Sequence, residues 1–241
     1  MDVGVILDFE TTGVNAEQDR IIEVGLIEFV VSDKKPPRIV QMLSEIEDPK
    51  CEISKEISEI TGIDQEMVTG RSIDWSKVRS ILERASLIIA HNAEFDLAFL
   101  KNRPELKGLD THWACSMRHI DWAKHGFKSQ KLTYLAADHG FLNPFPHRAL
   151  FDCATTFKLI SPYMSEMVEN SYQKFFVVKA VNSPFESKDI LKARRYQWSP
   201  QERCWYKVVL ESKLEEERQF LAEQVYQGTS RHVEEERPSL G

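Results

Sequence analysis

The chain has 241 residues, of which 42% are hydrophobic, and its 31 Lys and Arg residues are outnumbered by 38 Asp and Glu residues, for a net charge of −7. This length allows one large domain, or one of about 160–180 residues with a small appendage. No apolar run reaches the roughly 18–20 residues that span a bilayer, and the start lacks a signal-peptide pattern, so we expect no membrane association. The four cysteines form no CxxC pair, which predicts free thiols and a cytoplasmic location.

The acidic total disfavours a nucleic-acid-binding protein, because such proteins usually carry a basic stripe. The charge is unevenly distributed, however. Residues 173–212 are net positive by about four, whereas the residues beyond them are acidic again. The overall charge therefore does not exclude a basic binding surface.

Three extended segments come first in the chain. Residues 3–7 predict a buried strand, and residues 20–33 and 36–48 predict two more, with a short turn that favours an antiparallel meander. Residues 87–90 form a further apolar strand. Helical spacing is seen at residues 54–68 (broken near Gly62), 74–86, 93–103 (ended by Pro104), 131–140 and 147–164. The order predicts an α/β fold, a mixed sheet flanked by helices.

A composition shift near residues 165–173 marks a boundary. Beyond it we expect a small α+β unit at residues 173–228, with strands at 174–181 and 204–210 and helices at 187–196 and 211–228. Residues 229–241 are polar and are expected to be a flexible tail. The first domain is then residues 1–168.

Acidic side chains follow apolar elements at three places in the first domain. Asp8 and Glu10 end the first strand two residues apart, and therefore face the same side. Asp96 lies one turn into a helix after the strand 87–90, and Asp152 lies in a helix five residues after His147. Four converging carboxylates repel one another unless cations lie among them. Hard divalent ions such as Mg²⁺ or Mn²⁺ suit such oxygen ligands, and a pair of them about 3.5–4 Å apart can clamp a phosphodiester.

Each feature alone has an ordinary explanation. Asp96 could complement a helix dipole, and His147 and Asp152 could be a cap and a solvated helix face. Together, in this order, they are far more specific. The sequences DFETTG, HNAEFD and HRALFD resemble the three motifs of the DEDDh 3′–5′ exonucleases, over roughly residues 3–164. Within that group, HWACSMRHIDWA followed by HRALFDC is most similar to exonuclease X.

The resemblance implies an RNase H-like fold with a mixed five-stranded sheet and a metal-dependent enzyme that removes nucleotides from 3′ ends. It assigns five catalytic residues: Asp8, Glu10, Asp96, His147 and Asp152. The four acids would hold two Mg²⁺ or Mn²⁺ ions, and His147 would be the general base.

Four residues near these motifs are weaker candidates for binding the terminal nucleotide. Thr11 and Thr12 lie beside the acids, but they also suit turn chemistry before Gly13. Asn92 and Phe95 flank the second motif, and Phe95 equally suits the core.

The segment 185–208 resembles a small module found beside primases and conjugation proteins. It combines cations with aromatic rings, as single-strand binders do, and its candidate nucleic-acid contacts are Lys188, Lys192, Arg194, Arg195, Trp198 and Trp205. The two tryptophans equally suit the core of a tiny domain.

We therefore expect a 3′–5′ exonuclease acting on single-stranded or frayed DNA ends in repair or replication proofreading, with a polymerase or repair protein as a candidate partner. The alternatives are a 3′–5′ exoribonuclease and a catalytically silent scaffold. The intact set of acids argues against the scaffold, because a site without activity has no reason to retain carboxylates that repel one another.

Overall fold

The protein is described by a computed structural model covering residues 2–32, 35–228 and 231–237. The chain folds as two compact units that divide between Ser171 and Tyr172. Within the described residues, no helix is both long and apolar enough to cross a bilayer.

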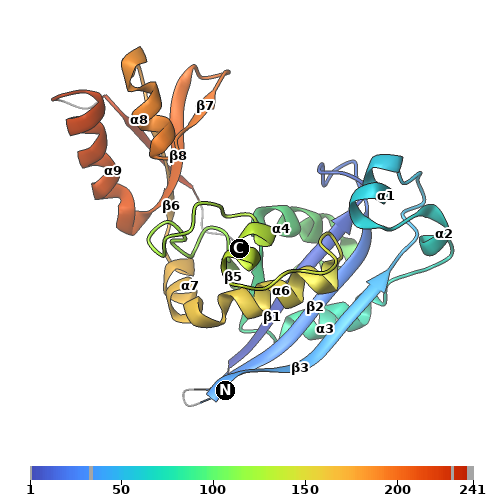
Figure 1. Ribbon diagram of the computed structural model, residues 1–241. Coiled ribbons are helices and arrows are strands. Elements are labelled where there is room, and N and C mark those ends of the chain that lie inside the picture. Colours follow the sequence, from blue (N-terminus) through green and yellow to red (C-terminus); the bar gives the residue numbers. More distant parts are fainter. Residues whose placement is uncertain (1, 33–34, 229–230, 238–241) are drawn as a thin grey trace. The chain divides into compact units, whose positions relative to one another are not determined.

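The first unit is built on a five-stranded sheet, as expected (Figure 1). Its strands are β1 (Asp2–Thr11), β2 (Ile21–Ser32), β3 (Lys35–Ile46), β4 (Leu87–Ala90) and β5 (Trp113–Cys115). Their order across the sheet is β3-β2-β1-β4-β5. The first three strands pair antiparallel, whereas β4 and β5 run parallel to β1. The predicted mixed α/β sheet is confirmed, and β1 lies at its centre with buried strands on both sides.

Seven helices flank the sheet in the described part of this unit. They are α1 (Lys55–Thr61), α2 (Gln65–Val68), α3 (Trp75–Arg84), α4 (Ala93–Asn102), α5 (Leu132–Asp138), α6 (Ala149–Ile160) and α7 (Met164–Ser171), with 3₁₀ turns at Pro104–Leu106 and Ser161–Tyr163. Local chemistry sets several of their ends. The side chains of Ser54, Asp64 and Asp74 cap α1, α2 and α3. Helix α4 ends before Pro104, as the sequence predicts.

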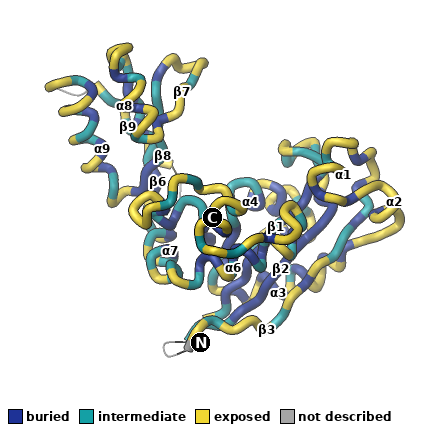
Figure 2. The backbone as a smooth tube through the Cα atoms, viewed as in Figure 1, coloured by how far each residue is buried: buried dark blue, intermediate teal, exposed yellow. Residues whose placement is uncertain are grey.

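The core of this unit lies between the sheet and α6. Strands β1 and β2 are buried over most of their length (Figure 2). Gly25 of β2 permits a close approach of α6, because a Cβ there would lie 2.3 Å from the backbone of Ala149. The buried side chains of this core include Phe29, Trp122 and Leu159. The start of α6 is thereby fixed against the central strands.

The second unit has its own sheet and core. Its strands are β6 (Phe175–Ala180), β7 (Gln197–Ser199), β8 (Cys204–Leu210) and β9 (Val233–Arg237), in the order β7-β8-β6-β9. Its helices are α8 (Lys188–Ala193) and α9 (Leu214–Phe220), with 3₁₀ turns at Phe185–Ser187 and Glu211–Lys213 and a π-helical turn at Leu221–Val225. The core contains Val178, Leu191, Tyr196 and Leu221.

One expectation about this unit is wrong. Residues 229–241 are predicted to be a flexible tail, but Val233–Arg237 is a strand that pairs antiparallel with β6. The side chains of this strand are charged and mostly exposed, so their pattern carries no strand signal. Ion pairs compensate, since Glu235 binds Lys179 of β6 and Glu234 binds Arg218 of α9. Residues 229–230 and 238–241 lie outside the described part.

Candidate active site

The first two acids lie at the carboxyl end of the central strand. Asp8 pairs with Gly25 across β1 and β2, and Glu10 pairs with Glu23. Asp8 is half-buried and Glu10 retains 9% exposure. Because alternate residues of a strand share a face, both carboxylates lie on the same side of the sheet.

Asp96 joins these acids from the first turn of α4. Its side chain is 1% exposed, and its Oδ1 accepts a hydrogen bond from the backbone N–H of Phe9 at 3.1 Å. Phe9 is the residue between the two β1 acids, so this bond ties the second motif directly to the first. The chain turns from β4 into α4 at Asn92, whose φ of 71° is left-handed.

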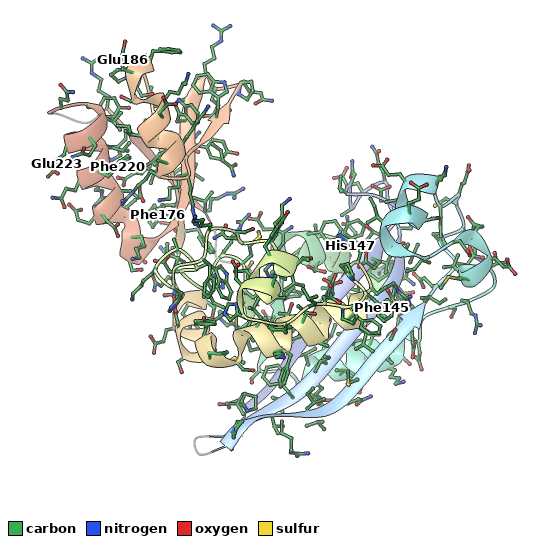
Figure 3. The ribbon with its side chains drawn as sticks, in the orientation of Figure 1. Phe145, His147, Phe176, Glu186, Phe220 and Glu223 are labelled. Atoms are coloured by element: carbon green, nitrogen blue, oxygen red, sulfur yellow. The ribbon has the colours of Figure 1, made fainter. Side chains whose placement is uncertain are left out.

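Asp152 and His147 approach from the start of α6. The backbone N–H of His147 donates to Oδ2 of Asp152 at 3.1 Å, and the side-chain amide of Asn143 donates to Oδ1. His147 itself has a left-handed φ of 61°. One donor atom each from Glu10, His147 and Asp152 lie within 4.8 Å of one another, and Figure 3 shows His147 on the segment that enters α6.

The electrostatics of the cluster are unfavourable without a cation. Burial and then the charges of Asp96, Glu10 and Asp152 raise the pKa of Asp8 well above its ordinary value. Burial also raises the pKa of Glu10 to about 8 and that of Asp96 to about 8. The pKa of Asp152 rises to about 6 through burial, although the hydrogen bond from His147 lowers it. Protons are retained here because the carboxylates have too little compensating positive charge.

These donors fit a hard divalent cation. The four carboxylates supply oxygen ligands, the kind that Mg²⁺ and Mn²⁺ prefer. A cation among them would replace the retained protons and remove the repulsion. The structure thus brings all five predicted catalytic residues to one end of β1, while the role of each stays a prediction.

A fifth acid beside the cluster, Glu23 of β2, was not among the predicted site residues. Its carboxylate is 1% exposed and accepts two hydrogen bonds from Arg148, at 3.1 and 3.0 Å, and one from the backbone N–H of Ala149 at 3.0 Å. Glu23 therefore caps α6 from a different strand. Glu23 could have been predicted from the sequence, because an acid inside the apolar run of residues 21–27 is the same pattern that marks Asp8.

Asn143 is the second residue that was missed. It is 9% exposed, and besides binding Asp152 it accepts a hydrogen bond from the backbone N–H of Phe145 at 3.1 Å. Nothing in its local sequence indicates this role, because the contact depends on how the loop before α6 folds back.

The predicted nucleotide-binding residues have structural contacts of their own. The Thr11 hydroxyl donates to the Gly13 carbonyl at 2.5 Å, and the Thr12 hydroxyl accepts from the Arg20 backbone N–H at 2.9 Å. These are the contacts of a turn. Phe95 is half-buried and packs against Phe99, with ring centroids 4.9 Å apart. Asn92 is exposed. Their contact with a substrate remains a prediction.

The candidate contacts of the second unit fall into three groups. Arg194 is held in ion pairs with Glu216 and Glu217 of α9, so its charge is already compensated. Trp198 is 47% exposed and lies opposite Trp205 across β7 and β8, with ring centroids 5.6 Å apart. Three further cations lie on or just after α8: Lys188, whose ammonium lies 5.1 Å from the ring centroid of Phe185, Lys192 and Arg195.

A group of carboxylates at the end of a central strand, joined by a histidine, is the arrangement of metal-dependent phosphodiester hydrolases. The chain belongs to the exonuclease family RNase_T, whose model matches residues 5–160. The predicted family is thereby confirmed, and the chain carries an exonuclease domain.

Curated relatives include much longer DNA polymerases. A DNA polymerase III PolC-type from Thermotoga petrophila is 33% identical over 179 residues, which is 68% of this chain and 12% of the relative. The enzyme of the same name from Clostridium perfringens is 30% identical over 191 residues, or 77% of this chain and 13% of the relative. The chain therefore spans only a small part of these relatives.

Solved structures include exonuclease X in complex with 5′ overhanging duplex DNA, at a TM-score of 0.50 and 26% identity, covering 67% of this chain and 91% of that one. E. coli exonuclease I in complex with a dT13 oligonucleotide has a TM-score of 0.59 at 13% identity, covering 73% of this chain and 48% of that one. The latter likeness is one of fold. The resemblance of the second unit to a primase-associated module stays a prediction.

Proposed function

We propose that this chain hydrolyses phosphodiester bonds successively from the 3′ ends of DNA, with two Mg²⁺ or Mn²⁺ ions held by Asp8, Glu10, Asp96 and Asp152. The observation that carries the proposal is the meeting of three separate motifs at one end of β1, with donor atoms of Glu10, His147 and Asp152 within 4.8 Å of one another. The raised pKa values of the acids support it, because such a cluster is costly unless a cation balances it.

The residues of the proposed site would have different roles. When bound, divalent ions would supply Lewis acidity and charge compensation at the phosphodiester. Asp8 and Glu10 on the rigid central strand, Asp152 on α6 and Asp96 on α4 would fix their positions. His147 would accept the proton of the attacking water, a role that suits an imidazole. Its exposed side chain can reach solvent, while its backbone N–H stays bound to Asp152.

DNA is the favoured substrate class. The PolC-type relatives are DNA polymerases by name, and the exonuclease X structure is a complex with duplex DNA. This supports a role in repair or in proofreading, with a polymerase or repair protein as partner, and the free cysteines fit a cytoplasmic location. The second unit would add weak nucleic-acid contacts through Lys188, Lys192, Arg195 and the exposed ring of Trp198, which would raise the local substrate concentration.

Digestion of matched 5′-labelled single-stranded DNA and RNA tests the proposal. We expect the wild-type chain to shorten DNA from the 3′ end in Mg²⁺ or Mn²⁺ but not in EDTA, and the Asp8→Asn variant to leave it intact. Faster shortening of RNA would replace the proposal with an exoribonuclease. No shortening of either substrate by folded protein in Mg²⁺ and Mn²⁺ would support a silent scaffold instead.

A further inference from the structure

Two phenylalanine rings stand exposed beside the acidic cluster. Phe145 is 56% exposed and Phe151 is 39% exposed, and their rings meet edge to face with centroids 4.8 Å apart. Burial of a phenylalanine side chain stabilises a protein, and much of this gain is forgone here. Leu142, in the same loop, is 76% exposed. Adjacent apolar side chains left in solvent commonly mark a contact surface.

The two rings are firmly joined to the candidate active site. Phe151 immediately precedes Asp152 on α6, and Phe145 lies two residues before His147. Figure 3 labels Phe145 and His147. The backbone N–H of Phe145 donates to Asn143, whose amide in turn donates to Asp152. The loop and the helix that carry the two rings are thereby held in a fixed position relative to the acids.

This surface offers little positive charge for binding a nucleic acid. The chain carries a net charge of −7, and the cluster itself holds four carboxylates. The neighbouring cation, Arg148, is engaged by the buried Glu23. Beyond the nucleotide that the metal ions would hold, protein cations beside these rings therefore contribute little to strand binding, whereas nucleobases stack on exposed aromatic rings.

We propose that Phe145 and Phe151 form a base-stacking subsite for the substrate strand, occupied by bases on the 5′ side of the terminal nucleotide. This inference rests on the proposed function. Because every base has a stacking face, the subsite takes any sequence and favours single-stranded or frayed ends over paired ones. It binds bases rather than backbone, so it distinguishes strands with and without bases more strongly than it distinguishes DNA from RNA.

Abasic substrates test the subsite in the whole 241-residue chain. The substrates are a 5′-labelled single-stranded DNA and the same strand with one abasic residue at the second, third, fourth or fifth position from the 3′ end. The variants are Phe145→Ala, Phe151→Ala, the ring-preserving Phe145→Tyr, and Tyr134→Ala as a control at an exposed aromatic residue of α5.

With wild-type protein, kcat/KM should fall about five- to thirtyfold for at least one abasic position, which corresponds to the stacking of one base. In the Phe145→Ala variant, kcat/KM on intact DNA should be lower by a similar factor, mainly through a higher KM. An abasic residue in the strand should lower kcat/KM of this variant little further. Tyr134→Ala should behave as wild type, and Phe145→Tyr, which keeps the ring, should retain the difference between intact and abasic strands.

Three results would overturn the subsite. One is equal hydrolysis of intact and abasic strands by wild-type protein. Another is wild-type rates on intact DNA for both alanine variants, which leaves the proposed function standing. A third is self-association of wild-type protein that both alanine variants abolish while the abasic effect is unchanged, which would assign the rings to a contact between copies. Failure of wild-type protein to shorten any strand would instead remove the proposed function.

Discussion

Asp8 is repelled by every other acid of the cluster. Burial raises its pKa, and so do the charges of four neighbouring acids, Asp96, Glu10, Asp152 and Glu23. Asp8→Asn removes one metal ligand and one repelling charge with almost no change in volume. We expect turnover to fall by on the order of 10³-fold or more, because the metal ions would lose one of their four carboxylate ligands. The metal-free variant should be more stable than wild type, by about 1 kcal/mol or more, in denaturant unfolding. Wild-type turnover in this variant would contradict the assignment.

Glu23 and Arg148 offer a second prediction for single residues. Glu23→Gln breaks a bidentate ion pair that anchors the start of α6. It should lower the free energy of unfolding by about 1–3 kcal/mol, because the guanidinium loses its buried partner. The matched control is Glu28→Gln on the same strand, whose partner Arg84 is 47% exposed. That change should cost less than about 1 kcal/mol. Equal losses in both variants would contradict a special role for Glu23.

At the scale of elements, the packing of α6 on β2 sets the position of the third motif. A Cβ at Gly25 would lie 2.3 Å from the backbone of Ala149, so Gly25→Ala must displace the start of α6. We expect a loss of about 1–3 kcal/mol of stability and a fall in turnover of on the order of a hundredfold, because Asp152 and His147 move with the helix. Denaturant unfolding and DNA digestion measure both effects.

Gly62→Ala is the control for this prediction. Gly62 ends α1 with a φ of 69° and has open space around its Cβ position. The change should cost about 1 kcal/mol through backbone strain and leave turnover unchanged. If Gly25→Ala also left turnover unchanged, the packing of α6 would not control the site.

Elements with strong periodicity were predictable from the sequence, and short or charged ones were not. The first four strands, α3, α4 and α6 follow from apolar spacing and from stops such as Pro104. Strands β5 and β7 have three residues each, too few to show a period. Strand β9 is charged throughout most of its length, and its place depends on partners in β6 and α9 that are distant in sequence. Tertiary contacts therefore decide where local signals are weak.

For the whole molecule, the raised pKa values predict how stability depends on pH. Glu10 and Asp96 keep their protons up to about pH 8 in the folded chain, but only to about pH 4 when unfolded. Between these values the folded state binds more protons, so these groups make stability fall as pH rises. A divalent cation should cancel this fall by replacing the protons.

Thermal unfolding between pH 4 and 9, with EDTA or with Mg²⁺, measures this effect. Because other groups also titrate, the comparison is between wild type and Asp96→Asn. In EDTA, wild type should lose stability relative to the variant as pH rises to about 8, and Mg²⁺ should reduce the difference. A constant difference in EDTA over the whole range would contradict the repulsion.

The site was predictable where it consists of motifs and not where it depends on folding of loops. Asp8, Glu10, Asp96, His147 and Asp152 stand in recognisable patterns at the ends of apolar segments, and the structure brings them together. Asn143 and Phe145 lie in a loop with no such pattern, and Phe151 lies inside the motif HRALFD, which gives no sign of its contact with Phe145. Their relation to Asp152 becomes visible only when the loop is seen folded against α6.

Calorimetric titration with Mn²⁺, combined with DNA hydrolysis on the same samples, is the most direct test of the acidic cluster as a metal-dependent catalytic centre. Wild-type protein should bind two Mn²⁺ ions and hydrolyse DNA. Asp8→Asn should lose at least one ion and its turnover together, whereas Asp110→Asn, at an exposed acid outside the cluster, should keep both. Hydrolysis by wild type in excess EDTA, or undiminished Mn²⁺ binding and turnover in Asp8→Asn, would contradict the mechanism.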